Sequence, residues 1–87
     1  MEVRTDHRLR RLRFRSAHRG CKELDIVFGR FAATWLGRLS DEQLGRYEAL
    51  LDVEDPLVLA WLIGGDSPPP DHDNDVLALL LATARSA

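Results

Sequence analysis

The chain has 87 residues, of which 45% are hydrophobic and 30% are charged, and its net charge is −2. This length and composition predict one small folded domain, because two cores would each be too small to be stable and a disordered chain would be less apolar. So short a chain leaves little room for a deep catalytic pocket, and we expect a binding or helper protein rather than an enzyme.

The N-terminal segment is strongly basic. Residues 1–20 contain seven arginines and two acidic residues, whereas residues 21–87 contain five basic and twelve acidic residues. We expect residues 1–7 to form a flexible arm and residues 8–18 a helix with Leu9 and Leu12 on its apolar face. The arginines indicate either a solvated helix face or a contact for nucleic acid or another anionic surface. Gly20 follows where the helix should end, because glycine adopts a left-handed backbone at least cost.

A second helix is predicted for residues 22–39, where apolar side chains recur at three- and four-residue spacing. Glu23 and Asp25 fall in its first turn, where carboxylates complement the helix dipole. Ser40 and Gln43 have the spacing of a capping box, in which each side chain accepts a hydrogen bond from the other residue's backbone. A third helix therefore follows Ser40 and should run to about residue 52.

Two more helices are predicted in the last third of the chain. Asp55 and Pro56 suit the cap and first position of a short fourth helix that ends at Gly64. Residues 66–71 contain three prolines and form a stiff connector, and a final helix should cover roughly residues 73–85. No run alternates with the period of a strand. The expected fold class is all-α, a five-helix bundle that forms a single domain over residues 8–85.

The sequence indicates no membrane-spanning segment, no secretory signal and no internal disulfide. No apolar run approaches the length that spans a membrane, and the N-terminus lacks the apolar stretch of a secretory signal. A single cysteine, Cys21, cannot form an internal disulfide. We therefore expect a cytoplasmic protein without membrane insertion.

The chain contains no convincing metal, cofactor or catalytic site. Its three histidines are scattered, and Cys21 has no partner at ligand spacing. Residues 71–75 resemble the start of a calcium loop, but Val76 stands where the loop needs glycine, so we interpret them as helix caps. No glycine-rich phosphate loop occurs. A small enzyme built around Cys21 remains a weaker alternative.

The segment His18-Arg19-Gly20-Cys21-Lys22-Glu23-Leu24-Asp25 is unusual because it places basic residues, a glycine and two acids between two helices. In a structural interpretation, Gly20 ends one helix and Glu23 caps the next. In a functional interpretation, Gly20 lets a partner's backbone approach, while Arg19 offers a forked donor and Glu23 an acceptor. Spacing alone does not decide between the two.

This segment resembles the RGxxE signature of the SdhE family, the FAD assembly factors of succinate dehydrogenase. Arg19, Gly20 and Glu23 match the signature, and Leu24-Asp25 follow it. The resemblance covers residues 9–64 and includes further short matches at Phe14-Arg15-Ser16, Phe28-Gly29-Arg30-Phe31, Leu39-Ser40-Asp41, Leu50-Leu51, Asp55-Pro56-Leu57 and Trp61-Leu62. The chain departs from the pattern at Ala17, where an aromatic residue often stands.

The resemblance implies a small monomeric bundle that binds the flavoprotein subunit of succinate dehydrogenase, and also of fumarate reductase, and promotes covalent attachment of FAD to it. By this resemblance Arg19, Gly20 and Glu23 belong to the partner contact, and we add His18 and Asp25 for their position and charge. The protein itself would hold no cofactor stably. The alternative function is a small nucleic-acid-binding module that uses the arginine-rich first helix.

Overall fold

Five α-helices and one short 3₁₀ turn make up the computed structural model, which describes the backbone of residues 2–86 and the side chains of residues 6–86. No strand occurs within residues 2–86, and the predicted all-α, five-helix fold is confirmed. In chain order the elements are α1 (Glu2–Ala17), α2 (Lys22–Trp35), the 3₁₀ turn η1 (Leu36–Arg38), α3 (Asp41–Leu51), α4 (Asp55–Leu62) and α5 (Asp75–Ser86).

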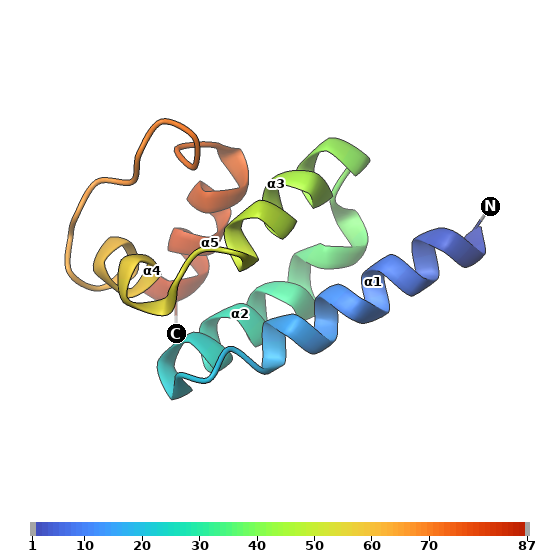
Figure 1. Ribbon diagram of the computed structural model, residues 1–87, viewed down its shortest axis with the longest axis horizontal. Helices are drawn as coiled ribbons and strands as arrows, with labels where there is room; N and C mark the ends of the chain where they lie inside the picture. The colour runs from blue at the N-terminus through green and yellow to red at the C-terminus, as the bar shows by residue number, and fades with distance from the viewer. Residues whose placement is uncertain (1, 87) are drawn as a thin grey trace.

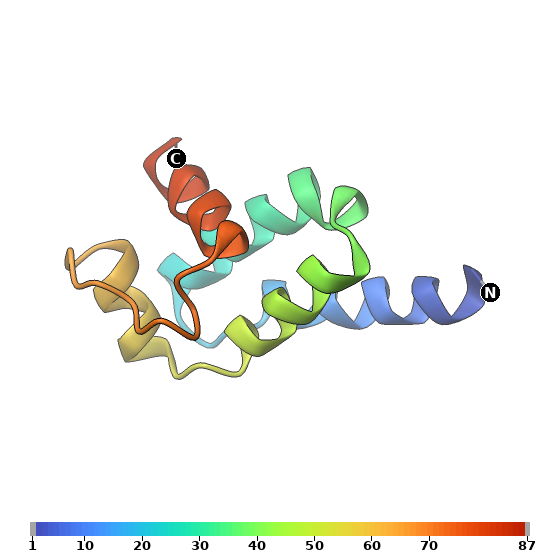
Figure 2. The same ribbon diagram turned by 90° about the horizontal axis from the view of Figure 1, so that it is seen from above.

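The helices form an elongated bundle of 40 × 26 × 22 Å. α1 and α2 run antiparallel as a helical hairpin, and α3 returns across them (Figure 1). α5 packs on both α2 and α3, while the short α4 lies at the end of the bundle near the α1–α2 turn (Figures 1 and 2). The first turns of α1 project beyond the other helices at the opposite end (Figure 2).

Tyr47 of α3 is at the centre of the core and is fully buried. Its ring stacks on that of Phe31, with the two centroids 5.0 Å apart. The Oγ of Ser16 donates to the carbonyl of Leu12 at 2.7 Å and lies 2.6 Å from the Tyr47 hydroxyl. Because the serine proton is used on the carbonyl, the tyrosine must be the donor between the two hydroxyls. Burial raises the pKa of Tyr47 to about 12.

Several predicted helix boundaries were wrong. α1 begins at Glu2, so residues 2–7 are helical rather than an arm, because no glycine or proline interrupts the residues that favour a helix; Met1 lies outside the described residues. α2 ends at Trp35 instead of residue 39, and the 3₁₀ turn η1 forms the next three residues of the predicted helix. The cap of α4 is Glu54, one residue before the predicted Asp55, and α5 starts at Asp75.

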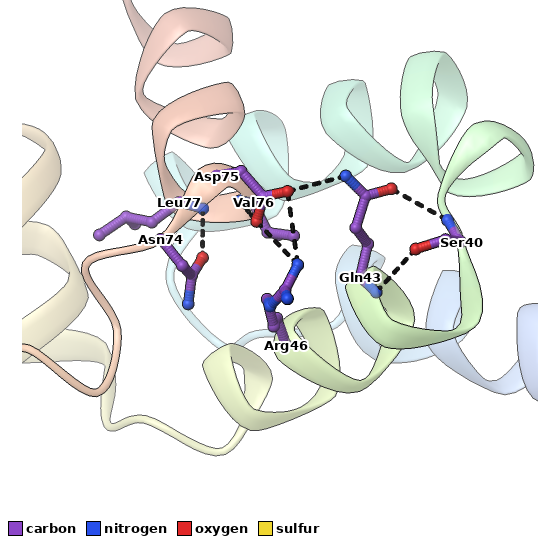
Figure 3. A network of polar contacts seen from close by, with 7 residues as sticks. All are labelled: Ser40, Gln43, Arg46, Asn74, Asp75, Val76 and Leu77. Carbon is purple, nitrogen blue, oxygen red and sulfur yellow. Dashed lines mark hydrogen bonds and ion pairs between the residues drawn. The ribbon is translucent and has the colours of Figure 1, made fainter.

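The start of α5 is fixed to the start of α3 by a polar network (Figure 3). The predicted capping box of Ser40 and Gln43 is confirmed, and the Gln43 amide also donates to Asp75 at 2.9 Å. Arg46 pairs with the same carboxylate at 3.1 Å, and Asn74 caps α5 through the backbone N–H of Leu77. These contacts attach α5, the helix that follows the proline-rich connector, to α3.

Two features are absent from the part of the chain that the structure describes. Its helices are all too short or too polar to cross a bilayer. No three side chains of histidine, cysteine, aspartate or glutamate come close enough together to hold a metal ion.

Candidate functional site

The predicted site residues lie at the turn between α1 and α2. α1 ends at Ala17, and Gly20 has a φ of +93°, a left-handed conformation that side chains other than glycine rarely adopt. The sequence-based expectation for Gly20 is therefore confirmed. The turn is held by Asp25, whose carboxylate accepts a hydrogen bond of 2.6 Å from the backbone N–H of Arg19. Asp25 therefore fixes the turn from the first helical turn of α2.

The side chain of Arg19 points into the molecule and is only 5% exposed. Its Nη1 donates to the carbonyl of Leu51, and its Nη2 donates to that of Val53 at 2.8 Å. Nη2 also pairs with the carboxylate of Asp55 at 2.8 Å. Arg19 thus connects the α1–α2 turn to the end of α3 and the beginning of α4. We call this set of contacts the arginine clasp.

The arginine clasp follows from the polar groups that helix ends leave without partners. Leu51 is the last residue of α3, where backbone carbonyls have no intrahelical donor, and Asp55 is in the first turn of α4. The guanidinium carbon also lies 4.9 Å from the centroid of the Phe28 ring, within the range of a cation–π contact. The Nε of Arg19 is buried without a hydrogen-bond partner among the described residues. The guanidinium is therefore occupied by contacts within the chain, so the forked donor that the sequence offered to a partner is used internally in this structure.

Glu23 points outward, unlike Arg19. Its side chain is exposed, and the thiol of Cys21 donates to its carboxylate at 3.3 Å. Its own backbone N–H and the Cys21 thiol hold the pKa of Glu23 below its usual value, with a smaller contribution from Lys22. Cys21 occupies the cap position of α2 but makes no side-chain cap bond, and Glu23 lies one residue inside the helix. Glu23 is thus a charged acceptor available to a partner.

An apolar hollow of about 490 Å³ lies beside Glu23. Ile26 from α2 and Ile63 at the end of α4 line it, and they are 46% and 69% exposed. Leu62 and Arg85 complete the side formed by α4 and α5. A carboxylate at the rim of an exposed apolar surface is a common arrangement in protein–protein contacts, where polar groups surround an apolar centre.

His18 lies on the other side of the turn. Its Nδ1 donates to the carbonyl of Phe14 at 2.7 Å, and the two rings stack with centroids 4.1 Å apart. Together with Arg15, Arg19 and Asp55, these rings line a second hollow of about 280 Å³. His18 is exposed, so it is available to a partner on this side of Gly20.

The structure therefore exposes His18, Gly20 and Glu23 around the turn, with His18 and Glu23 beside different hollows. It uses Asp25 and the Arg19 side chain for contacts within the molecule. Sequence reasoning missed Asp55 as the partner of Arg19, and it missed Ile26 and Ile63 as an exposed apolar pair. Ile26 lies off the apolar stripe of α2, which is a signal that could have identified it. No comparable signal pairs Arg19 with Asp55, because they are 36 residues apart in the sequence.

A protein family described as the flavinator of succinate dehydrogenase matches residues 10–84, which contain the turn, the arginine clasp and Glu23. The chain belongs to this family. The family description and the names of relatives agree with the resemblance that the Arg19-Gly20-x-x-Glu23 segment indicated, and no comparison supports the nucleic-acid-binding alternative.

Individual members of the family show how far the similarity extends. FAD assembly factor SdhE of Acetobacter pasteurianus is 33% identical over 78 residues, which cover 90% of this chain and 72% of the relative. FAD assembly factor SdhE of Legionella pneumophila (strain Lens) is 42% identical over 50 residues, 58% of this chain and 63% of the relative. The mitochondrial succinate dehydrogenase assembly factor 2 of Dictyostelium discoideum is 31% identical over 71 residues, 82% of this chain and 50% of the relative. The chain thus spans between half and three quarters of these relatives, and no solved structure gives a significant match.

Proposed function

We propose that this protein is an assembly factor that binds the flavoprotein subunit of succinate dehydrogenase and promotes covalent attachment of FAD to that subunit. The observation that carries the proposal is the family match over residues 10–84, together with the names of relatives that are FAD assembly factors. Fumarate reductase is a second candidate client. FAD belongs to the client in this proposal, and this chain holds no cofactor of its own.

The mechanism that fits a chain of this size is positioning rather than catalysis. Covalent attachment needs a side chain of the client to be held at reacting distance from the flavin, and correct orientation alone can lower a barrier by several kcal/mol. A helper that binds only the competent arrangement of the client increases the population of that arrangement by its differential affinity. In this proposal the helper supplies a rigid surface and no reacting group.

The residues of the turn have different parts in this mechanism. Glu23 accepts hydrogen bonds from the client at the rim of the apolar hollow, and Gly20 allows the client's backbone to approach because it has no side chain. His18 makes a contact on the opposite side of Gly20. Arg19 and Asp25 are positioning residues, because their bonds fix the turn on which the other residues lie.

The test uses purified flavoprotein subunit, FAD and this protein, with covalent flavin measured by fluorescence on a denaturing gel. We expect faster or fuller covalent attachment when the protein is present, and no difference would overturn the proposal. Glu23→Gln should weaken the effect, whereas Glu42→Gln should not, because Glu42 is an exposed glutamate on α3 away from the turn. Equal behaviour of these two variants would contradict the role given to Glu23.

Other properties of the protein stay predictions. We expect it to be monomeric when free and cytoplasmic. Cys21→Ser should leave flavin attachment unchanged, because the thiol supplies only a hydrogen bond to Glu23 in this account. Loss of attachment in that variant would revive the alternative of a small enzyme built around Cys21.

A further inference from the structure

The outer side of α1 faces away from the bundle, and the proposed function gives no role to its arginines, although Phe14 at its end also borders the hollow at His18. Leu12 and Ser16 face the core, while His7, Arg10, Arg11 and Phe14 line a shallow depression of about 360 Å³ on the outer side. We call these four residues the cationic face. Helical spacing brings them together, because residues three, four and seven positions apart lie on one side of a helix.

The arginines of α1 divide into paired and unpaired groups. Arg8 pairs with Glu48 at 3.0 Å, and Arg15 pairs with Asp52 at 2.6 Å, so the flank that faces α3 is neutralised. Arg10 and Arg11 are exposed, and no carboxylate whose side chain the structure describes lies within ion-pair distance of either. That includes Asp6, the acidic residue one turn before Arg10. The positive charge of the cationic face is therefore not compensated within the described molecule.

The cationic face also has an exposed apolar component. Phe14 is 64% exposed although it is a large aromatic residue, and the stacked ring of His18 holds it in place. Arginine side chains beside an exposed aromatic ring are enriched in the centres of protein interfaces. An apolar ring with guanidinium groups next to it matches a ligand that carries carboxylates beside an apolar side chain.

We propose that the cationic face binds an acidic segment of a partner protein that carries an apolar residue among its carboxylates. Charge complementarity favours this occupant over a membrane, because an interfacial helix needs a broad apolar face and Phe14 is the only large apolar residue on this face. It also favours a short acidic segment over a nucleic acid. A long polyanion gains most from an extended basic surface, whereas residues 21–87 carry twelve acidic residues against five basic ones.

The inference does not depend on the proposed function, so a synthetic probe tests it separately. The probe is a short fluorescein-labelled peptide of glutamates around one central phenylalanine, and binding is followed by fluorescence anisotropy at low and at physiological salt. We expect Arg10→Glu/Arg11→Glu to weaken binding by about tenfold or more, because each exchange removes an attraction and adds a repulsion. The matched control is Arg30→Glu/Arg38→Glu, which changes the net charge equally at two exposed sites on α2 and η1.

The outcomes separate the cationic face from general electrostatics. Binding by the wild type and the control but not by Arg10→Glu/Arg11→Glu supports the proposal, as do amide shifts of the wild type confined to residues 7–14 on adding the peptide. No binding by the wild type, equal weakening in both double variants, or shifts spread over the whole molecule overturns it. An oligothymidine of equal charge that binds the same face more tightly than the peptide also overturns it.

Discussion

Arg19 and Glu23 belong to the same short turn but have opposite environments. The Arg19 side chain is 5% exposed and uses both terminal nitrogens of its guanidinium on the α3–α4 segment. Glu23 is exposed, and among the described side chains only the thiol of Cys21 forms a hydrogen bond with it. A short sequence motif therefore does not have to be a single contact surface. One of its charged residues can build the scaffold, and the other can face the partner.

The comparison implies that the two residues respond differently to substitution. Substitutions at Arg19 should lower the stability of the fold, and any loss of function should follow from that loss of stability. Exchanges at Glu23 should change function with little effect on stability. The following predictions run from the largest expected effect on stability to the smallest.

Arg19→Ala should lower the free energy of unfolding by about 3–5 kcal/mol, because it leaves Asp55 and two partly buried carbonyls without their donor. Urea denaturation followed by circular dichroism measures the change. The control is Arg46→Ala, which breaks an exposed ion pair with Asp75 and should cost about 1 kcal/mol or less. If the two substitutions cost the same, the arginine clasp is not a buried structural element.

Tyr47, packed below the turn, should make the protein sensitive to alkali. Its pKa is raised by burial to about 12, so the folded state keeps the phenol proton that the unfolded state loses near pH 10. Stability is therefore fully present below about pH 10 and falls as the pH rises toward about 12, by about 2–3 kcal/mol.

Because Tyr47 is the only tyrosine, absorbance at 295 nm reports its ionisation directly. Tyrosinate should appear together with unfolding rather than near pH 10. Tyr47→Phe should lose this part of the pH dependence. Ionisation near pH 10 in a protein that is still folded would show that the hydroxyl reaches solvent.

Gly20→Ala should lower the free energy of unfolding by about 1–2 kcal/mol, because alanine is strained at a φ of +93°. Space is not the cause, since the nearest atom to an added Cβ is a carboxylate oxygen of Asp55 at 4.0 Å. Gly29→Ala in the interior of α2 provides a control of opposite sign. An added Cβ there meets nothing within 4 Å, so thermal unfolding should show a gain of up to about 1 kcal/mol.

Glu23→Gln should change the free energy of unfolding by less than about 0.5 kcal/mol, because the side chain is exposed and its one side-chain hydrogen bond among the described residues comes from a thiol, a weak donor. The same urea titration used for Arg19→Ala measures it. A loss comparable with that of Arg19→Ala would remove the distinction between the two residues.

Local features of the fold could be predicted from the sequence because they depend on near neighbours. The capping box of Ser40 and Gln43, the left-handed Gly20 and the existence of five helices are of this kind. The predicted start of α1 was wrong because nothing in the sequence prevents the helix from beginning before residue 8. The cap of α4 was wrong by one residue because Glu54 and Asp55 are both acidic and both precede Pro56.

The direction of the Arg19 side chain could not be predicted, because it depends on how α3 and α4 return to the α1–α2 turn. Its partners Leu51, Val53 and Asp55 are more than 30 residues away along the chain. The hollow beside Glu23 has the same origin, since α2, α4 and α5 all contribute to it. Sequence patterns identified the residues of the turn, but only the packing of distant helices assigns them to the interior or the surface.

The most direct test of this account is the affinity of the flavoprotein subunit for wild-type protein and for Glu23→Gln, measured by calorimetry on samples whose unfolding has been compared first. We predict that Glu23→Gln unfolds at the same urea concentration as the wild type but binds at least about tenfold more weakly. Equal affinity of the two proteins would contradict the claim that Glu23 is the outward, partner-facing half of the turn.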